Sequence, residues 1–101
     1  WPSRGWIEIE GLRDWRLPLG HGVVRVGREP DNDICLSDKS VHRYHAAIHR
    51  SDDKQFVITD LSSVRGDGVV VNGQRVSETR LRSGDRIELG LARLMFVARP
   101  A

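Results

Sequence analysis

Val69-Val70-Val71-Asn72-Gly73-Gln74-Arg75-Val76 is the stretch that says most about how this chain folds. Valine favours extended strands because its branched side chain packs well on a pleated surface. Asn72 and Gly73 both tolerate the positive φ angles that a two-residue type I′ turn requires. The stretch therefore predicts a tight β-hairpin with one strand on each side of Asn72-Gly73.

Short alternations of apolar and polar residues continue on both sides of this hairpin. They include Ile7-Glu8-Ile9, Val24-Arg25-Val26, Phe56-Val57-Ile58 and Ile87-Glu88-Leu89. Turn residues separate these bursts at intervals of about ten residues, and no window keeps a helical period. Gly90 predicts a final hairpin between strands at 85–89 and 92–98. We therefore expect an all-β sandwich in which one face of each strand is buried.

Length and composition limit the class of protein. A chain of 101 residues is long enough for one small domain, and because it begins abruptly at Trp1 we expect residues 1–101 to be a single domain of a longer protein. With 39% hydrophobic and 30% charged residues, the composition is that of a globular domain, without membrane insertion. Cys35 is the only cysteine, which excludes an internal disulfide and fits a reducing compartment, so we expect a cytoplasmic location.

The charge pattern bears on partners. The formal net charge is +2, and acidic residues are spread among the basic ones. No long basic tract follows the chain, so we do not expect nucleic-acid binding. Trp1, Trp6 and Trp15 lie in the opening segment, where we expect them to pack against the edge of the sandwich, with a partner surface as the alternative.

Several segments, read in order, resemble the forkhead-associated (FHA) family. They are Val26-Gly27-Arg28, Asn32-Asp33-Ile34-Cys35-Leu36, Val41-His42-Arg43-Tyr44-His45-Ala46-Ala47-Ile48, Ile58-Thr59-Asp60-Leu61-Ser62-Ser63, Val71-Asn72-Gly73 and Leu81-Arg82-Ser83-Gly84-Asp85-Arg86-Ile87-Glu88-Leu89-Gly90. The resemblance covers roughly residues 22 to 97. Each motif is weak alone, and their order and spacing together are specific.

The resemblance implies a fold and a function. The fold is the SMAD/FHA-like twisted sandwich of two antiparallel sheets. The function is recognition of a phosphothreonine-containing segment of another protein by loops at one end of the sandwich, without enzymatic activity or a cofactor. A Ser/Thr kinase would then act upstream of the partner.

Arg28 matches the family arginine that contacts phosphate, and Gly27 precedes it as the family glycine does. A guanidinium presents a rigid fork of donors that can bind two phosphate oxygens at once. Asn32, Asp33 and Asp38 are expected to form turns and loops, in which Asn and Asp side chains can bind nearby backbone and so hold Arg28 in place. Arg28 is therefore the expected phosphate anchor.

The segment around position 42 departs from the family pattern. The resemblance places a phosphate-binding serine where this chain has His42, which can still donate a hydrogen bond and can carry a charge. Arg43 follows and is a candidate second cation. His45 matches the family histidine that holds the binding loops together, so we expect it to be buried and to take no part in phosphate contact.

The loop before the Asn72-Gly73 hairpin is about two residues longer than the family norm, which leaves its alignment open. Counting back from the hairpin places Asp67-Gly68 at the family's peptide-binding Asn-Gly position, and counting forward from Ser63 places Arg65-Gly66 there. Aspartate only accepts hydrogen bonds and repels phosphate. We take Ser63, Arg65 and Asp67 as candidate ligand residues, and Gly68, Asn72 and Gly73 as support.

Other chemistry is disfavoured. Three histidines near Cys35 suggest a metal site, but His45 and His49 on one strand would stand about 13 Å apart. The sequence has neither a Gly-x-Ser-x-Gly elbow nor a nucleotide-binding glycine motif. Two functions remain: phosphothreonine recognition, and a degenerate domain that acts as a phosphate-independent scaffold, for example in a bacterial secretion or signalling machine. His42 and Asp67 favour the second.

Overall fold

The computed structural model describes residues 3–20, 22–62 and 68–100 of the chain, with eleven β-strands. The strands are β1 (Ser3–Ile9), β2 (Arg16–Leu19), β3 (Val24–Gly27), β4 (Ile34–Cys35), β5 (Ala46–Arg50), β6 (Phe56–Asp60), β7 (Val69–Val71), β8 (Gln74–Val76), β9 (Glu78–Arg80), β10 (Arg86–Leu89) and β11 (Ala92–Pro100).

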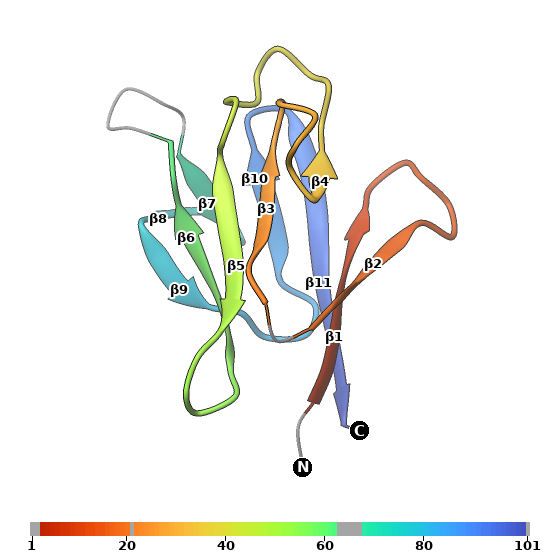
Figure 1. The fold of residues 1–101 in the computed structure, drawn as a ribbon, viewed down its shortest axis with the longest axis vertical. Coiled ribbons are helices and arrows are strands. Elements are labelled where there is room, and N and C mark those ends of the chain that lie inside the picture. Colours follow the sequence, from red (N-terminus) through yellow and green to blue (C-terminus); the bar gives the residue numbers. More distant parts are fainter. Residues whose placement is uncertain (1–2, 21, 63–67, 101) are drawn as a thin grey trace.

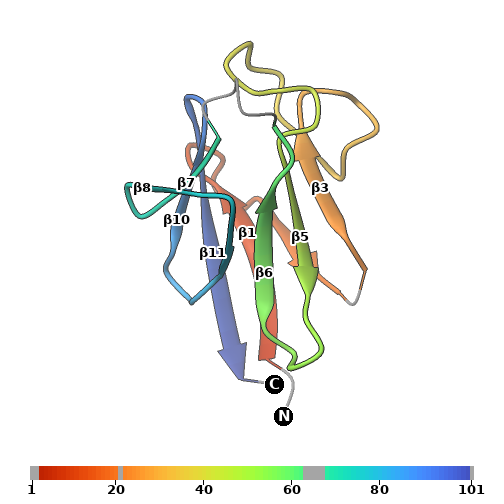
Figure 2. The same cartoon turned by 90° about the vertical axis from the view of Figure 1, so that its left-hand side faces the viewer.

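These strands form two sheets that face each other (Figures 1 and 2). A six-stranded sheet has the order β2-β1-β11-β10-β7-β8, and a five-stranded sheet has the order β4-β3-β5-β6-β9. The predicted all-β sandwich is confirmed. One pairing departs from the antiparallel expectation: β4 runs parallel to β3, with Val26 opposite Ile34 and Gly27 opposite Cys35. The connection between these strands turns the chain back on itself, so that the short β4 runs beside the end of β3 in the same direction.

Both hairpins that the sequence predicts are present. β7 and β8 pair from Val69↔Val76 to Val71↔Gln74, and the turn between them has φ angles of 51° at Asn72 and 84° at Gly73. β10 and β11 pair from Arg86↔Met95 to Leu89↔Ala92 around Gly90, whose φ is 61°. Asn72 also braces its hairpin, because its side chain accepts from the backbone N–H of Arg86 (2.9 Å) and donates to Asp85 (2.9 Å).

The core lies between the sheets and is built from the inward residues of each alternating strand. Phe56 of the five-stranded sheet and Phe96 of the six-stranded sheet meet at a centroid distance of 5.3 Å. Each such side chain stabilises the fold by about 1.5–3 kcal/mol when fully buried. The large, fully buried aliphatic residues around them are Ile7, Val26, Ile34, Val41, Ile48, Ile58, Val69, Ile87 and Leu89.

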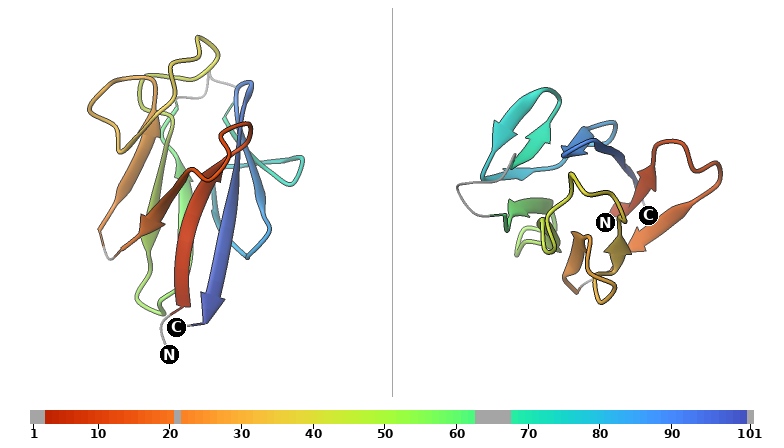
Figure 3. Two further views of the ribbon diagram at one scale, coloured as in Figure 1. Left: turned by 90° about the vertical axis from the view of Figure 1, so that its right-hand side faces the viewer. Right: turned by 90° about the horizontal axis from the view of Figure 1, so that it is seen from above.

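The loops and turns between strands lie at the two ends of the sandwich. The β3–β4 and β4–β5 connections lie at one end together with the β10–β11 turn, while the start of β1 and the end of β11 lie at the other (Figures 1 and 3). Ser3 is paired with Pro100 there. No part of the described chain forms a helix with the length and hydropathy of a membrane span.

We predict that Asn72→Ala lowers the free energy of unfolding by about 1–2 kcal/mol, because alanine resists the left-handed φ and removes both side-chain hydrogen bonds. Urea denaturation followed by tryptophan fluorescence measures this change. Gln74→Ala, at an exposed position of the same hairpin, serves as the control. Equal stabilities for the two variants would contradict the bracing role of Asn72.

Candidate functional site

Arg28 stands where β3 ends and the chain enters the loop-bearing end of the sandwich. Its side chain is exposed. Among the described residues, its guanidinium has neither an ion-pair partner nor a hydrogen-bond acceptor. Its backbone, by contrast, is fixed, since its N–H donates to the carbonyl of His42 (3.0 Å). Arg28 is therefore a cation without an ion-pair partner among the described residues, on backbone that is hydrogen-bonded to His42.

A ladder of backbone hydrogen bonds holds the Arg28 segment against residues 42–45. Beyond the Arg28–His42 bond, the N–H of Glu29 donates to the carbonyl of Arg43 (3.2 Å) and that of His45 to the carbonyl of Val26 (2.9 Å). The two connections are thus aligned beside each other past the ends of their strands. Arg28, His42 and Arg43, which the sequence suggests as ligands, come from these two neighbouring segments.

Gly27 allows this close approach. A Cβ atom placed on Gly27 would lie 2.2 Å from the carbonyl oxygen of Arg43 and 2.8 Å from the Asn32 amide nitrogen. Real Cβ atoms do not approach backbone oxygens so closely, so a side chain here would separate the two segments. The glycine that precedes Arg28 is therefore required by backbone packing.

Asn32 joins the same two segments from the side. It is buried, with 7% of its surface exposed. Its amide donates to the carbonyls of Glu29 and Arg43, both at 2.8 Å. Both donors of the amide are used, one on each segment. The expectation that Asn32 forms the loop behind Arg28 is confirmed.

His45 is fully buried, and its ring links the His42 segment to Gly68. Its Nδ1 accepts from the backbone N–H of His42 (3.1 Å), and its Nε2 lies 2.7 Å from the carbonyl oxygen of Gly68. An N–H can only donate and a carbonyl can only accept, so these partners require the neutral tautomer with the proton on Nε2. The ring thereby ties the His42 segment to the residue that precedes β7, and its expected burial is confirmed.

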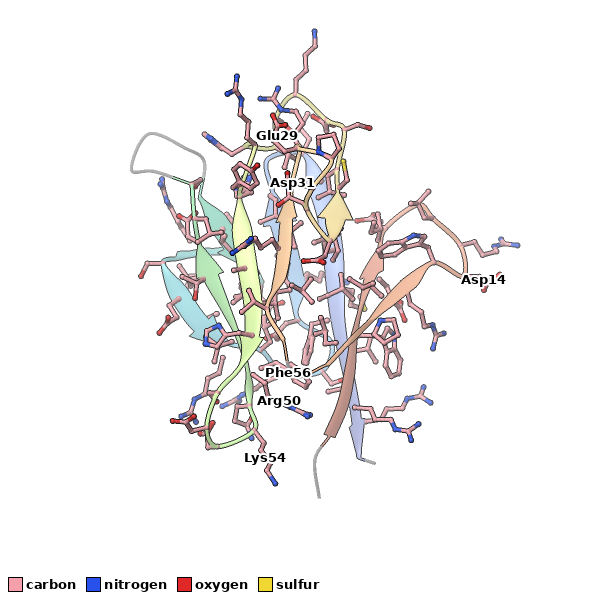
Figure 4. All side chains as sticks on the ribbon, viewed as in Figure 1. Asp14, Glu29, Asp31, Arg50, Lys54 and Phe56 are labelled. Carbon is pink, nitrogen blue, oxygen red and sulfur yellow. The ribbon has the colours of Figure 1, made fainter. Side chains whose placement is uncertain are left out.

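His42 and Arg43 differ in how available they are. His42 is half-buried, with its ring edge-on to that of His45 at 5.2 Å and 85° between the planes. Arg43 is exposed and forms an ion pair with Glu29, whose Oε1 lies 3.7 Å from its Nε (Figure 4 labels Glu29). Exposed pairs of this kind contribute little and exchange readily. Of the two arginines, Arg28 is thus the one without an ion-pair partner among the described residues.

Two further contacts at this end were not suggested by the sequence motifs. Ser40 donates its hydroxyl to Asp38 (2.7 Å), which lowers the pKa of that carboxyl, and accepts from the backbone N–H of Leu91 (2.8 Å). Tyr44 donates to Asp31 (3.0 Å), and this hydrogen bond raises the pKa of the phenol. The Asp38-Lys39-Ser40 turn is a local signal, but its docking on the β10–β11 turn is visible only in three dimensions.

The remaining predicted residues fall into two groups. Ser63, Arg65 and Asp67 lie outside the described residues, so both alignments of their loop stay open. Asn72 and Gly73 are described, and the side-chain contacts of Asn72 are with Asp85 and Arg86 at the start of β10, not with the residues around Arg28. Within the described ranges, no three His, Cys, Asp or Glu side chains form a group able to hold a metal ion.

Comparison with known proteins agrees with this arrangement. The model of the FHA domain family matches residues 24–90. The glycogen accumulation regulator GarA of Mycobacterium tuberculosis is 35% identical over 85 residues, which are 84% of this chain and 51% of GarA. The chain thus spans about half the length of the curated relatives it matches.

Solved structures extend the likeness over the whole sandwich. One from a study of phosphothreonine-dependent FHA domain interactions has a TM-score of 0.85 at 28% identity, covering 98% of this chain and 99% of its own. EmbR of Mycobacterium tuberculosis, solved with a low-affinity phosphopeptide, has a TM-score of 0.83 at 30% identity, covering 97% of this chain and 25% of its own. The chain belongs to the FHA domain family.

We predict that Gly27→Ala lowers the free energy of unfolding by about 1–3 kcal/mol, the usual cost of forcing atoms into a packed site. Urea denaturation measures this change. Gly20→Ala is the matched control, because a Cβ there meets nothing within 4 Å. If both alanine variants unfold at the same urea concentration, the close approach of Gly27 to Arg43 is not a constraint on the fold.

Proposed function

We propose that this domain binds a phosphothreonine-containing segment of another protein, with Arg28 as the phosphate anchor. The observation that carries the proposal is the exposed guanidinium of Arg28, which is unpaired among the described residues and stands on backbone fixed by His42. Many surface arginines form an ion pair with a nearby carboxylate, and Arg28 does not do so with any described residue. Here its base is held by Gly27, Asn32 and the His45 network.

Electrostatics explain how such a site separates phosphothreonine from threonine. A phosphate ester carries between one and a half and two negative charges near pH 7, and it offers three strong acceptor oxygens. Arg28 can engage two of these oxygens in parallel charge-assisted hydrogen bonds. The unmodified hydroxyl offers no comparable acceptor. Discrimination therefore arises at Arg28 itself, while the rest of the peptide contributes affinity.

His42 supplies a second contact in this proposal. Its backbone is fixed on both sides, because its N–H donates to His45 and its carbonyl accepts from Arg28. The side chain therefore starts from a defined position beside Arg28. A neutral imidazole provides one donor, and a protonated one adds a charge. Ser63, Arg65 and Asp67 remain candidate ligands from the loop before Gly68.

The relatives support a regulatory setting. GarA is named as a regulator, and EmbR was solved with a phosphopeptide. We infer that a Ser/Thr kinase creates the segment that this domain binds, and that the domain acts by binding, in the cytoplasm, without catalysis or a cofactor. Strands β1, β2 and β11 complete a sheet that extends past residues 24–90. We therefore propose that residues 1–101 form a single domain, larger than the segment that the family model matches.

The competing function is a scaffold that has lost phosphate dependence, and the observation in its favour is His42 at the family's serine position. A half-buried imidazole is larger than a hydroxyl and presents different hydrogen-bonding groups to a phosphate. The two functions differ in one measurable respect. A scaffold binds phosphorylated and unmodified forms of a partner segment equally.

We predict that a phosphothreonine peptide library binds and that its unmodified twin does not, measured by calorimetry. Arg28→Ala should weaken phosphopeptide binding by about 1.5–3 kcal/mol, or about 10- to 150-fold, the range for a hydrogen bond to a charged group. Arg82→Ala, an exposed arginine in the β9–β10 connection, is the control and should bind as the parent does. Equal binding of both libraries would favour the scaffold.

His42→Ala should weaken phosphopeptide binding by about 0.5–1.5 kcal/mol at pH 7, because one donor to the phosphate is lost. His49→Ala, a half-buried histidine on β5, controls for removal of an imidazole. Calorimetry at matched pH keeps the titration of the phosphate itself constant. Unchanged affinity in His42→Ala would show that the imidazole makes no contact with phosphate.

A further inference from the structure

The outer face of the six-stranded sheet carries a second group of unpaired cations. Along β1, Gly5 and Ile7 point into the core, so Arg4, Trp6 and Glu8 point outward. β1 lies between β2 and β11 (Figure 3). The residues next to Trp6 on these neighbours are Pro18 on one side and Val97 on the other. Trp6 therefore lies in the middle of a three-stranded outer surface.

Two arginines flank the Trp6 ring. The guanidinium carbon of Arg16 lies 4.9 Å from the ring centroid, and that of Arg99 lies 5.6 Å from it. The ring is also held in place, since its Nε1 donates to Glu8 (2.7 Å). Arg4 stands opposite Arg99 on the same face, and we call Arg4, Trp6, Arg16 and Arg99 the Trp6 cluster. Trp6 within it remains partly exposed.

The arginines of the Trp6 cluster lack carboxylate partners among the described residues. The ion pairs between described residues join Arg43 to Glu29, Arg80 to Asp53 and Arg93 to Glu10, and none of them includes an arginine of the cluster. Arg4 and Arg99 even stand directly opposite each other in the β1–β11 register. Like charges at such positions destabilise a sheet. The contact of Arg99 with the Trp6 ring offsets part of this repulsion, and an anionic partner would relieve the rest.

The same face continues into a groove beside the Trp6 cluster. The groove has a volume of about 400 Å³, and its lining includes Glu8, Arg86, Glu88, Arg93 and Met95. Met95 is 36% exposed, and it stands between Glu8 on β1 and Arg86 on β10. The face is thus mainly basic around Trp6, with Glu8 at the border, and it is of mixed charge around the apolar side chain of Met95 in the groove.

We propose that this face binds an acidic segment of a protein partner. Carboxylates of that segment meet Arg4, Arg16 and Arg99, and an apolar side chain next to them contacts Met95 in the groove. Charge complementarity selects this occupant. A nucleic acid fits less well, because its continuous phosphate backbone would have to run past Glu8, Glu10 and Glu88, whereas a peptide can place its carboxylates at the arginines and an apolar side chain in the groove. The site goes beyond the proposed phosphopeptide site and uses no residue of it.

The probe is a capped peptide, Glu-Glu-Leu-Glu-Glu-Leu-Glu-Glu, titrated into isotopically labelled protein and followed by amide NMR shifts. We expect shifts at residues 4–8, 16–18 and 95–99, and a loss of affinity at high salt because the charges are exposed. Arg16→Glu with Arg99→Glu should weaken binding about tenfold or more, since two attractive pairs become repulsive.

The control variant carries Lys54→Glu with Arg82→Glu, which changes the net charge equally at exposed positions outside the cluster. It should bind the peptide as the parent does, and so should Arg28→Ala. Arg16→Gln with Arg99→Gln replaces the charge reversal if that variant does not fold. Shifts absent from the cluster, equal losses in both charge-changed variants, or tighter binding of a duplex oligonucleotide at the cluster would each overturn the proposal.

Discussion

The site end of this domain depends on one buried imidazole. His45 accepts from the His42 N–H and donates to the Gly68 carbonyl. A single ring therefore sets the spacing between the β4–β5 connection of one sheet and the residue that precedes β7 of the other. The ring has no exposed surface, and each of its two nitrogens has one of these partners. Only one tautomer and one orientation of the ring satisfy both hydrogen bonds. The rigid position of Arg28 follows, because its backbone is bonded to the residue that His45 holds.

Close packing of backbone on backbone complements this network. Gly27 lets the Arg43 carbonyl approach, and Asn32 then closes the gap with two hydrogen bonds from one amide. The result is a binding end in which the scaffold is buried and neutral while the cations are exposed. Such a division suits recognition of an anion, because the charged groups remain able to reorganise around a ligand while their bases do not move.

The two faces of the domain use arginine in different ways. Arg28 is a single guanidinium held at a loop, suited to the compact charge of a phosphate. The Trp6 cluster places the guanidinium groups of Arg16 and Arg99 against an aromatic ring, with Arg4 opposite Arg99 on the same exposed face, an arrangement suited to several dispersed carboxylates. The cluster lies on the six-stranded sheet, whereas Arg28 follows β3 of the five-stranded sheet.

The alternating segments at 7–9, 24–26, 56–58 and 87–89, both hairpins and the family were readable from the sequence alone, because alternation of apolar residues and the Asn72-Gly73 pair are local signals of local geometry. The sequence also pointed to His45 and Asn32 as residues that hold the site. Only the tertiary structure decided the parallel pairing of β3 with β4, the docking of Ser40 on the β10–β11 turn, and the opposition of Arg4 to Arg99. These contacts join residues far apart in the chain, and their partners are selected by how the two sheets close on a shared core, which no local pattern encodes.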